Sequence, residues 1–149
     1  MTSKYAAHES NVNVLTTELD SLGDAGIAIT ATALSNDAAT TERDLFATFA
    51  LSISAQGTAR STGARCDLYV IPEVNTSFAY GSGALSPSPN HYRGSFFFDA
   101  DTSARRDILE GIKLPNSDYH VLLINNTGQA FAASGNVLSM EITPGYEDV

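Results

Sequence analysis

The stretch FAASGNVLSM, residues 131 to 140, contains the residues that most resemble a reactive site. Its central Ala-Ser-Gly-Asn is either a polar loop that cradles a phosphate or presents Ser134 as a nucleophile, or a sharp turn between strands. A phosphate cradle needs a helix after the glycine, because the helical N-terminal amides converge on the anion. Here Leu138, Met140 and Ile142 instead follow at alternate positions, which is the period of a strand. We therefore predict that Ser134 belongs to a turn.

A second candidate site is the acidic segment FFFDADTSARRD, because hard oxygen donors at close spacing can hold calcium. Its carboxylates belong to Asp99, Asp101 and Asp107. The segment lacks the glycine and the distal glutamate of an EF-hand loop, and Arg105 and Arg106 are close enough to pair with these acids. We favour a capped turn with surface ion pairs over a metal site. Residues 101 to 110 could also hold a short turn of helix.

The remaining candidates for catalysis are the three histidines, His8, His91 and His120, which are dispersed along the chain. An enzyme hypothesis, for example a small hydrolase, would rest on His91 or His120. The sequence contains no GxSxG elbow, P-loop, Rossmann fingerprint or HExxH motif. We therefore predict that the chain is not an enzyme and that it uses no cofactor and no metal.

Composition restricts the class of protein and of partner. The 149 residues suit one domain, and 43% hydrophobic with 17% charged residues suits a folded core. The net charge of -9 opposes binding to nucleic acid, because such affinity depends on neutralising phosphates. The single cysteine, Cys66, lies in an apolar run and is expected to be a buried thiol. No secretory signal or membrane span is evident, so we expect a soluble protein made in a reducing compartment, with no membrane partner.

Short segments of strand character, separated by Gly, Pro, Asn and Ser turns, account for most of the chain. The clearest is RDLFATFALSISAQ, where apolar and polar residues alternate. The candidate strands are residues 11–19, 26–34, 43–56, 66–74, 91–99, 106–114, 119–125 and 137–142. This pattern predicts an all-β fold, a jelly-roll or Greek-key β-sandwich of about eight strands. We expect a flexible N-terminal arm over residues 1–10 and a single domain over residues 11–149.

Some strands are apolar on both faces, as sandwich strands covered by an arm, a loop or a neighbouring subunit would be. In a regular strand Phe96 and Phe98 share a face with Tyr92, and Phe97 points the opposite way. Phe97 then either packs under a loop or belongs to an exposed apolar patch, which usually marks an interface. Tyr69 raises the same question. The candidate interface residues are Tyr5, Val12, Val14, Tyr69 and Phe97.

Three phrases of the sequence carry a resemblance to a known family. They are CDLYVIPEVN, YRGSFFFDADTSARRDILEGIKLP and YHVLLINNTGQAFAASGNVLSMEITPGYE. Their order resembles that in small virion proteins of tailed bacteriophages, where an LYLVPEVDG-like strand, a GSF strand and an AASGNTL strand succeed one another. The likeness covers roughly residues 43 to 146.

The resemblance implies a jelly-roll-like capsid decoration (cement) protein that binds the outer surface of the phage head. Its partner would be the major capsid protein, its oligomeric state a homotrimer, and its site of synthesis the host cytoplasm. The alternative is a phage tail, fibre or baseplate β module that binds host-surface carbohydrate. For that alternative the loop at residues 80 to 91, with Tyr80 and Tyr92, would form the site, although the loop could equally be a plain connection.

Overall fold

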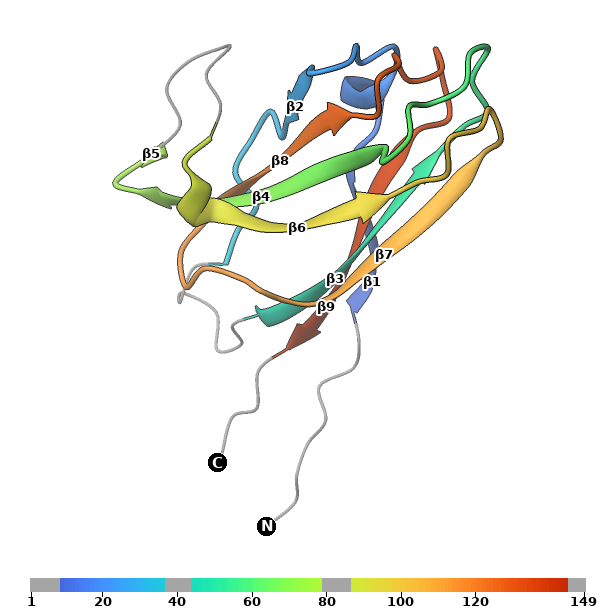
Figure 1. Ribbon diagram of the computed structural model, residues 1–149. Coiled ribbons are helices and arrows are strands. Elements are labelled where there is room, and N and C mark those ends of the chain that lie inside the picture. The colour runs from blue at the N-terminus through green and yellow to red at the C-terminus, as the bar shows by residue number, and fades with distance from the viewer. Residues whose placement is uncertain (1–8, 37–43, 79–86, 145–149) are drawn as a thin grey trace.

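The structure, a computed structural model, describes residues 9–36, 44–78 and 87–144, which form strands and two single-turn 3-10 helices (Figure 1). The strands are β1 (Glu9–Leu15), β2 (Ile27–Ile29), β3 (Asp44–Ile53), β4 (Arg65–Val74), β5 (Ser77–Phe78), β6 (Tyr92–Phe97), β7 (Arg105–Lys113), β8 (Tyr119–Asn126) and β9 (Val137–Pro144). The helical turns are η1 (Thr17–Leu19) and η2 (Pro89–His91). The expectation of an all-β chain is confirmed.

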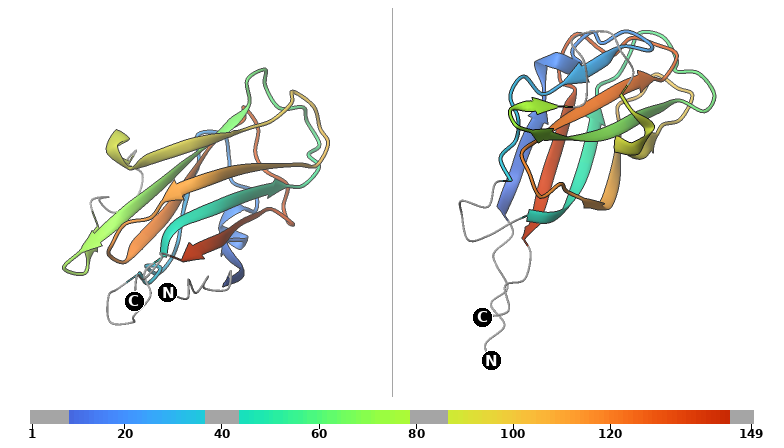
Figure 2. Two further views of the ribbon diagram at one scale, coloured as in Figure 1. Left: turned by 90° about the horizontal axis from the view of Figure 1, so that it is seen from below. Right: turned by 90° about the vertical axis from the view of Figure 1, so that its left-hand side faces the viewer.

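The strands form two packed antiparallel sheets, which the views in Figures 1 and 2 show as two layers. One sheet has the order β1-β9-β3-β7 and the other has the order β2-β8-β4-β6, with β5 paired to the end of β4. The pairs β1·β9, β2·β8, β3·β7 and β4·β6 are nested along the chain, like one long hairpin. Pairing of β9 with β3 and of β8 with β4 rolls that hairpin up. This topology is the predicted jelly roll.

The main core lies between the two sheets. The apolar residues at alternate positions of β3 form part of this core, as the sequence pattern predicts. Phe49, Leu51 and Ile53 all point inward and are at most 2% exposed. The other sheet contributes Leu68 and Val70 of β4, both fully buried. Further members of the same cluster are Leu15, Ala28, Cys66, Phe96, Val121, Leu123, Leu138 and Met140.

Several boundaries differ from the sequence prediction, for local reasons. Strand β1 begins at Glu9, so the last two residues of the predicted arm belong to this strand, and Glu9 pairs with Ile142 of β9. The helical turn η1 replaces the end of the predicted first strand. Strand β2 has only three residues, and Leu34 forms an isolated bridge to Tyr119. The short helix considered for residues 101–110 is wrong, because Arg105 onward extends along β3 as strand β7.

The segment that first suggested a reactive site is a turn, as predicted. Ser134 is exposed in a bend, and Gly135 has a left-handed φ of 82° just before β9 begins. Asn136, only 2% exposed, holds this turn to two other loops. Its side-chain oxygen accepts from the Ser54 amide at 3.1 Å, and its side-chain nitrogen donates to Asp20 at 3.0 Å.

Candidate interaction surface

The outward side of the β2-β8-β4-β6 sheet carries a second apolar cluster, separate from the main core. Ile71 and Leu122 are fully buried although they lie on this outer side. Half-buried neighbours pack against them, namely Ile27, Ile29, Tyr69 and Ile124. Two more aromatic side chains lie on the same side along β6, Tyr92 and Phe97, which are 45% and 64% exposed. We call the surface formed by Ile27, Ile29, Ile124, Tyr69, Tyr92 and Phe97 the aromatic face.

Tyr92 lies on the opposite side of β6 from the sequence prediction. Phe96 and Phe98 point into the core as expected, with exposures of 0% and 8%. The prediction that Tyr92 shares their side is wrong, because its ring instead contacts that of Tyr69 on the aromatic face. The two ring centroids are 5.6 Å apart in a T-shaped arrangement, at an interplanar angle of 64°.

A β-bulge explains this reversal. Leu68 pairs with Gly94, but the next residue of β4, Tyr69, pairs with Tyr92, so Arg93 is an extra residue on β6. One extra residue shifts every side chain before it to the other side of the sheet. Gly94 makes the bulge possible, because it has a φ of +144° and a Cβ there would lie 3.2 Å from Leu109. The bulge thus places both tyrosines on the aromatic face.

A hydrogen-bonded network fixes the polar groups of this surface. Asp67, 8% exposed, accepts from the Ser95 hydroxyl at 2.5 Å and from the Asn126 side-chain amide at 2.7 Å. It also accepts from the Arg65 guanidinium at 3.2 Å. Ser95 in turn is 2.7 Å from the Tyr92 hydroxyl, so a chain of bonds runs from the exposed ring to the buried carboxylate. The Tyr92 hydroxyl, Ser95 and Asp67 are thus all partnered, which holds the Tyr92 ring in one arrangement.

Electrostatics reinforces that arrangement. Partial burial is the largest cause that raises the pKa of Tyr69, and the nearby Asp67 carboxylate raises it further. Both effects favour the neutral phenol. Tyr69 therefore presents an uncharged hydroxyl over the whole neutral pH range.

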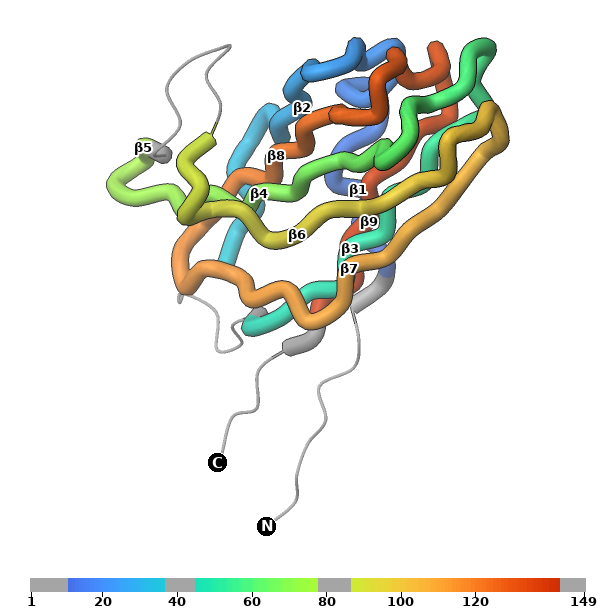
Figure 3. The backbone as a smooth tube through the Cα atoms, viewed as in Figure 1, coloured from blue at the N-terminus to red at the C-terminus, as the bar shows by residue number. Residues whose placement is uncertain are grey.

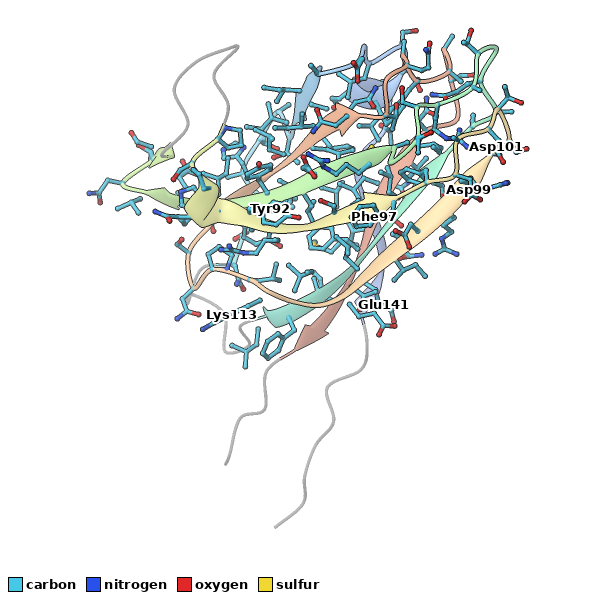
Figure 4. The ribbon with its side chains drawn as sticks, viewed as in Figure 1. Tyr92, Phe97, Asp99, Asp101, Lys113 and Glu141 are labelled. Atoms are coloured by element: carbon cyan, nitrogen blue, oxygen red, sulfur yellow. The ribbon has the colours of Figure 1, made fainter. Side chains whose placement is uncertain are left out.

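The predicted interface residues are divided between two regions. Tyr69 and Phe97 lie on the same side of the sheet, but Phe97 pairs with Arg65, four residues along β4 from Tyr69. Figure 4 labels Phe97 at the end of β6. Val12 and Val14 lie on β1, an edge strand of the other sheet, where Val12 is 37% exposed and Val14 packs against the main core. Tyr5 lies outside the described residues, as do Tyr80 and most of the loop considered for carbohydrate binding.

The acidic segment is a clasp between loops. Asp101 accepts from Arg60 at 2.6 Å and also from Arg105, so one carboxylate bridges two guanidinium groups. Arg105 also pairs with Asp99 at 3.3 Å, while Asp107 instead accepts from the Phe97 amide at 2.8 Å. The predicted pairing is thus found for Arg105 but not for Arg106, and the second partner is buried Arg60. Figure 4 shows Asp99 and Asp101 where β6 passes toward β7.

Arg60 is the member of this clasp that sequence reasoning missed. Its side chain is fully buried, and it also donates to the backbone oxygens of Asp99 and Ser103 at 3.1 and 3.0 Å and to the Gln56 side chain at 3.2 Å. The guanidinium carbon also lies 6.0 Å from the centroid of the Phe98 ring. The loop sequence SAQGTARSTG around it contains no apolar pattern that signals burial.

The histidines have separate environments. His120, 7% exposed, lies on β8 with its Nδ1 atom 3.1 Å from the Thr30 carbonyl oxygen and 3.2 Å from the Thr30 hydroxyl. His91 lies in η2, where burial first and the Arg93 charge second lower its pKa. His8 lies outside the described residues. Within residues 9–36, 44–78 and 87–144, no group of three or more His, Cys, Asp or Glu side chains could hold a metal ion.

The sequence predicted the environment of Cys66 but not the role of the isoleucines on the aromatic face. Cys66 is buried as expected, and that burial is the largest cause that raises the pKa of its thiol, followed by the Asp67 carboxylate. The isoleucines of the aromatic face were not singled out, because β2 is short and its alternation, Ile27 outward and Ala28 inward, is too brief to read.

The described part of the chain includes no helix long and apolar enough to span a bilayer.

Comparison with solved structures shows a likeness to a β-sandwich domain of another protein. It is the CBM36-1 domain of a multidomain xylanase from the hindgut metagenome of Trinervitermes trinervoides. The match has a TM-score of 0.46 and 13% sequence identity, and it covers 86% of this chain and 77% of that one. No protein-family description matches the sequence, and no curated protein matches it either.

Proposed function

We propose that this chain is a non-enzymatic virion protein, a capsid decoration protein that binds the outer surface of a tailed-phage head through its aromatic face. The observation that carries the proposal is the presence of two exposed rings, Tyr92 and Phe97, on one side of one sheet. Half-buried Tyr69 lies on the same side and contacts Tyr92. Exposed apolar patches on soluble proteins usually mark interaction sites. Tyrosine is also enriched among the residues that contribute most binding energy at protein interfaces.

Preorganisation of the surface favours binding. The Tyr92 hydroxyl is held through Ser95 to Asp67, so its ring is already fixed before a partner arrives. Ordering a mobile side chain on binding costs about 0.5–1.5 kcal/mol, and a fixed ring avoids most of that cost. A rigid jelly roll with a prearranged apolar face suits a protein that must fit a regular lattice.

The ring geometry favours a protein partner over a sugar at this surface. Tyr69 and Tyr92 meet edge to face at 64°, so together they present a ridge rather than a flat platform. Phe97 adds a ring with no polar group. A ridge of this kind fits a pocket on a protein partner, while stacking against a planar ligand needs open ring faces.

Charge and sequence resemblance give further support. The net charge of -9 suits a protein on the outside of a shell, away from packaged nucleic acid. The strand and turn phrases that resemble small virion proteins extend over three of the four strands that form the aromatic face, β4, β6 and β8, but not over β2. The major capsid protein is the partner we propose, with a trimer of this chain as the bound form.

Cosedimentation with capsids tests the proposal. The probe is the purified chain, added to capsids of the same particle that were assembled without it. The wild-type chain should saturate them, and Phe97→Ser should weaken binding at least tenfold without loss of stability, because Phe97 is 64% exposed. Val74→Ser is the matched control, since Val74 is also 64% exposed but lies at the far end of β4, and it should bind normally. A chain that never pellets with such capsids, or a Phe97→Ser variant that binds like the wild type, contradicts the proposal.

A further inference from the structure

A polar pocket lies at one end of the sandwich, away from the bulk of the aromatic face. It forms where the turn from β4 to β5 meets the connection between β7 and β8, beside the β5 hairpin in Figures 1 and 3. Its volume is about 270 Å³. The residues that line it are Glu73, Asn75, Thr76, Asn116, Ser117 and Asp118.

Backbone contacts fix both walls. The Glu73 amide donates to the Asp118 carbonyl oxygen at 2.7 Å, which joins the end of β4 to the start of β8. Asn75 and Thr76 both have left-handed φ values, 52° and 62°, as a two-residue hairpin turn requires. Buried Asn36 donates its backbone amide to an Asp118 carboxylate oxygen at 2.9 Å. The pocket is therefore formed before any ligand arrives.

The polar groups of the pocket are largely available. The Glu73 carboxylate and the side-chain amides of Asn75 and Asn116 make no hydrogen bond or ion pair within the described residues. Asp118 uses one carboxylate oxygen for Asn36. The lining thus offers free acceptors on two carboxylates and both donors and acceptors on two amides.

We propose that this pocket binds one neutral sugar unit of a glycan. Each sugar hydroxyl donates one hydrogen bond and accepts others, which matches the mixture of carboxylates, amides and hydroxyls on the walls. An anionic ligand is disfavoured, because Glu73 and Asp118 both carry negative charge and no cationic side chain is among the described lining residues. An apolar ligand finds no aliphatic or aromatic wall among those residues.

The volume of the pocket favours a sugar over a bare metal ion as its ligand. A calcium ion needs oxygens at about 2.3–2.6 Å, a far smaller space than the one here. The volume of about 270 Å³ leaves room for several ordered water molecules. A pyranose ring with its hydroxyls replaces a comparable group of waters, and its hydroxyls reproduce their hydrogen bonds.

The test is an NMR titration of the full, ¹⁵N-labelled chain with glucose, galactose, mannose and N-acetylglucosamine in turn. At least one of these sugars should shift the side-chain amide signals of Asn75 and Asn116 in a saturable manner. Glu73→Gln and Asn116→Ala should each weaken that binding at least fivefold. Glu110→Gln is the matched control, because Glu110 is an exposed carboxylate on β7 outside the pocket, and it should leave binding unchanged.

Three results would overturn the sugar site. The first is that none of the four sugars shifts either amide at millimolar concentration. The second is sugar binding that Glu73→Gln and Asn116→Ala leave intact. The third is that calcium, added alone, shifts the same amides while the sugars do not. These outcomes are independent of capsid binding, which the Phe97→Ser variant tests on the aromatic face.

Discussion

Gly94 determines which side chains reach the aromatic face. Its φ of +144° is rarely adopted by residues with a side chain, and the bulge that it allows turns Tyr92 outward beside Tyr69. The Asp67 network then fixes the Tyr92 ring through Ser95. The surface that we propose for capsid binding thus depends on one backbone conformation and one buried carboxylate.

Gly94→Ala should lower the free energy of unfolding by at least about 1 kcal/mol, because a Cβ at a positive φ is strained. The added Cβ would also lie 3.2 Å from Leu109. Urea denaturation measures the change. Gly57→Ala is the control, since nothing lies within 4 Å of a Cβ there and its φ is not positive, and it should change stability little. Equal stability of both variants would show that the bulge does not need glycine.

Cys66 should make the fold sensitive to alkali. Burial and Asp67 raise the pKa of its thiol above that of the unfolded chain, about 8.5. The folded state thus holds the thiol proton more tightly, so this contribution to stability is complete below about pH 8.5 and is lost progressively above it. The pKa of Tyr69 is raised as well, but from an ordinary value near 10, so its effect comes at higher pH.

Denaturation of wild type and Cys66→Ala from pH 7 to 10 separates these groups. The variant should be less stable at pH 7, because it leaves a small cavity, yet it should lose less stability than the wild type between about pH 8.5 and 10. Parallel curves for the two proteins would contradict the assignment to Cys66.

For single residues, the sequence predicted which side of the sheet a side chain occupies only where the strand is regular. The inward and outward alternation of β3 was readable, because nothing interrupts its core side from Ala47 to Ile53. The side of the sheet that Tyr92 occupies could not be predicted, because a β-bulge depends on how the strand pairs with its neighbour. The presence of Gly94 alone does not show which residue of β6 becomes the extra residue of the bulge.

The connection from β6 to β7 is held by a buried cation rather than by an apolar core. Arg60 reaches from the loop after β3 and binds oxygens of Asp99, Asp101 and Ser103. Asp101 also pairs with Arg105, which starts β7. The clasp therefore joins the β3–β4 connection to the β6–β7 connection, next to the first residue of β7.

Arg60→Ala should destabilise the fold by about 2–4 kcal/mol, because it removes a buried guanidinium and leaves its acceptors without donors. Arg60→Lys should recover little of this loss, since an ammonium group lacks the planar fork that reaches several acceptors together. Arg106→Ala is the control, because Arg106 is exposed on β7 and should change stability by less than about 0.5 kcal/mol. Chemical denaturation of the three variants checks this order, and an Arg60→Ala variant as stable as Arg106→Ala contradicts it.

The eight strands expected from the sequence are all present, because alternation and turn residues are local signals. Two features of the structure, the arginine clasp and the polar pocket, could not be predicted from local sequence signals. The clasp joins Arg60 to acids about 40 residues away, and the polar pocket joins two turns that are equally separated. Both depend on how the nested hairpin rolls up, which no local pattern specifies.

The molecule presents two separate candidate binding surfaces, the aromatic face and the polar pocket. The aromatic face covers the outer side of one sheet, and the polar pocket opens at the end where β4 turns into β5. The opposite sheet exposes single apolar side chains, among them Phe46 and Ile108, at 43% and 45%. A chain with these separate surfaces can be seated on a protein lattice by one of them and still expose another.

The proposed capsid role is tested by a cryo-electron-microscopy map of phage particles that contain this chain. We expect the chain on the outside of the head, as a trimer, with Tyr69, Tyr92 and Phe97 buried against the major capsid protein. Density for the chain on the tail, or on the head with the aromatic face turned to solvent, would contradict it.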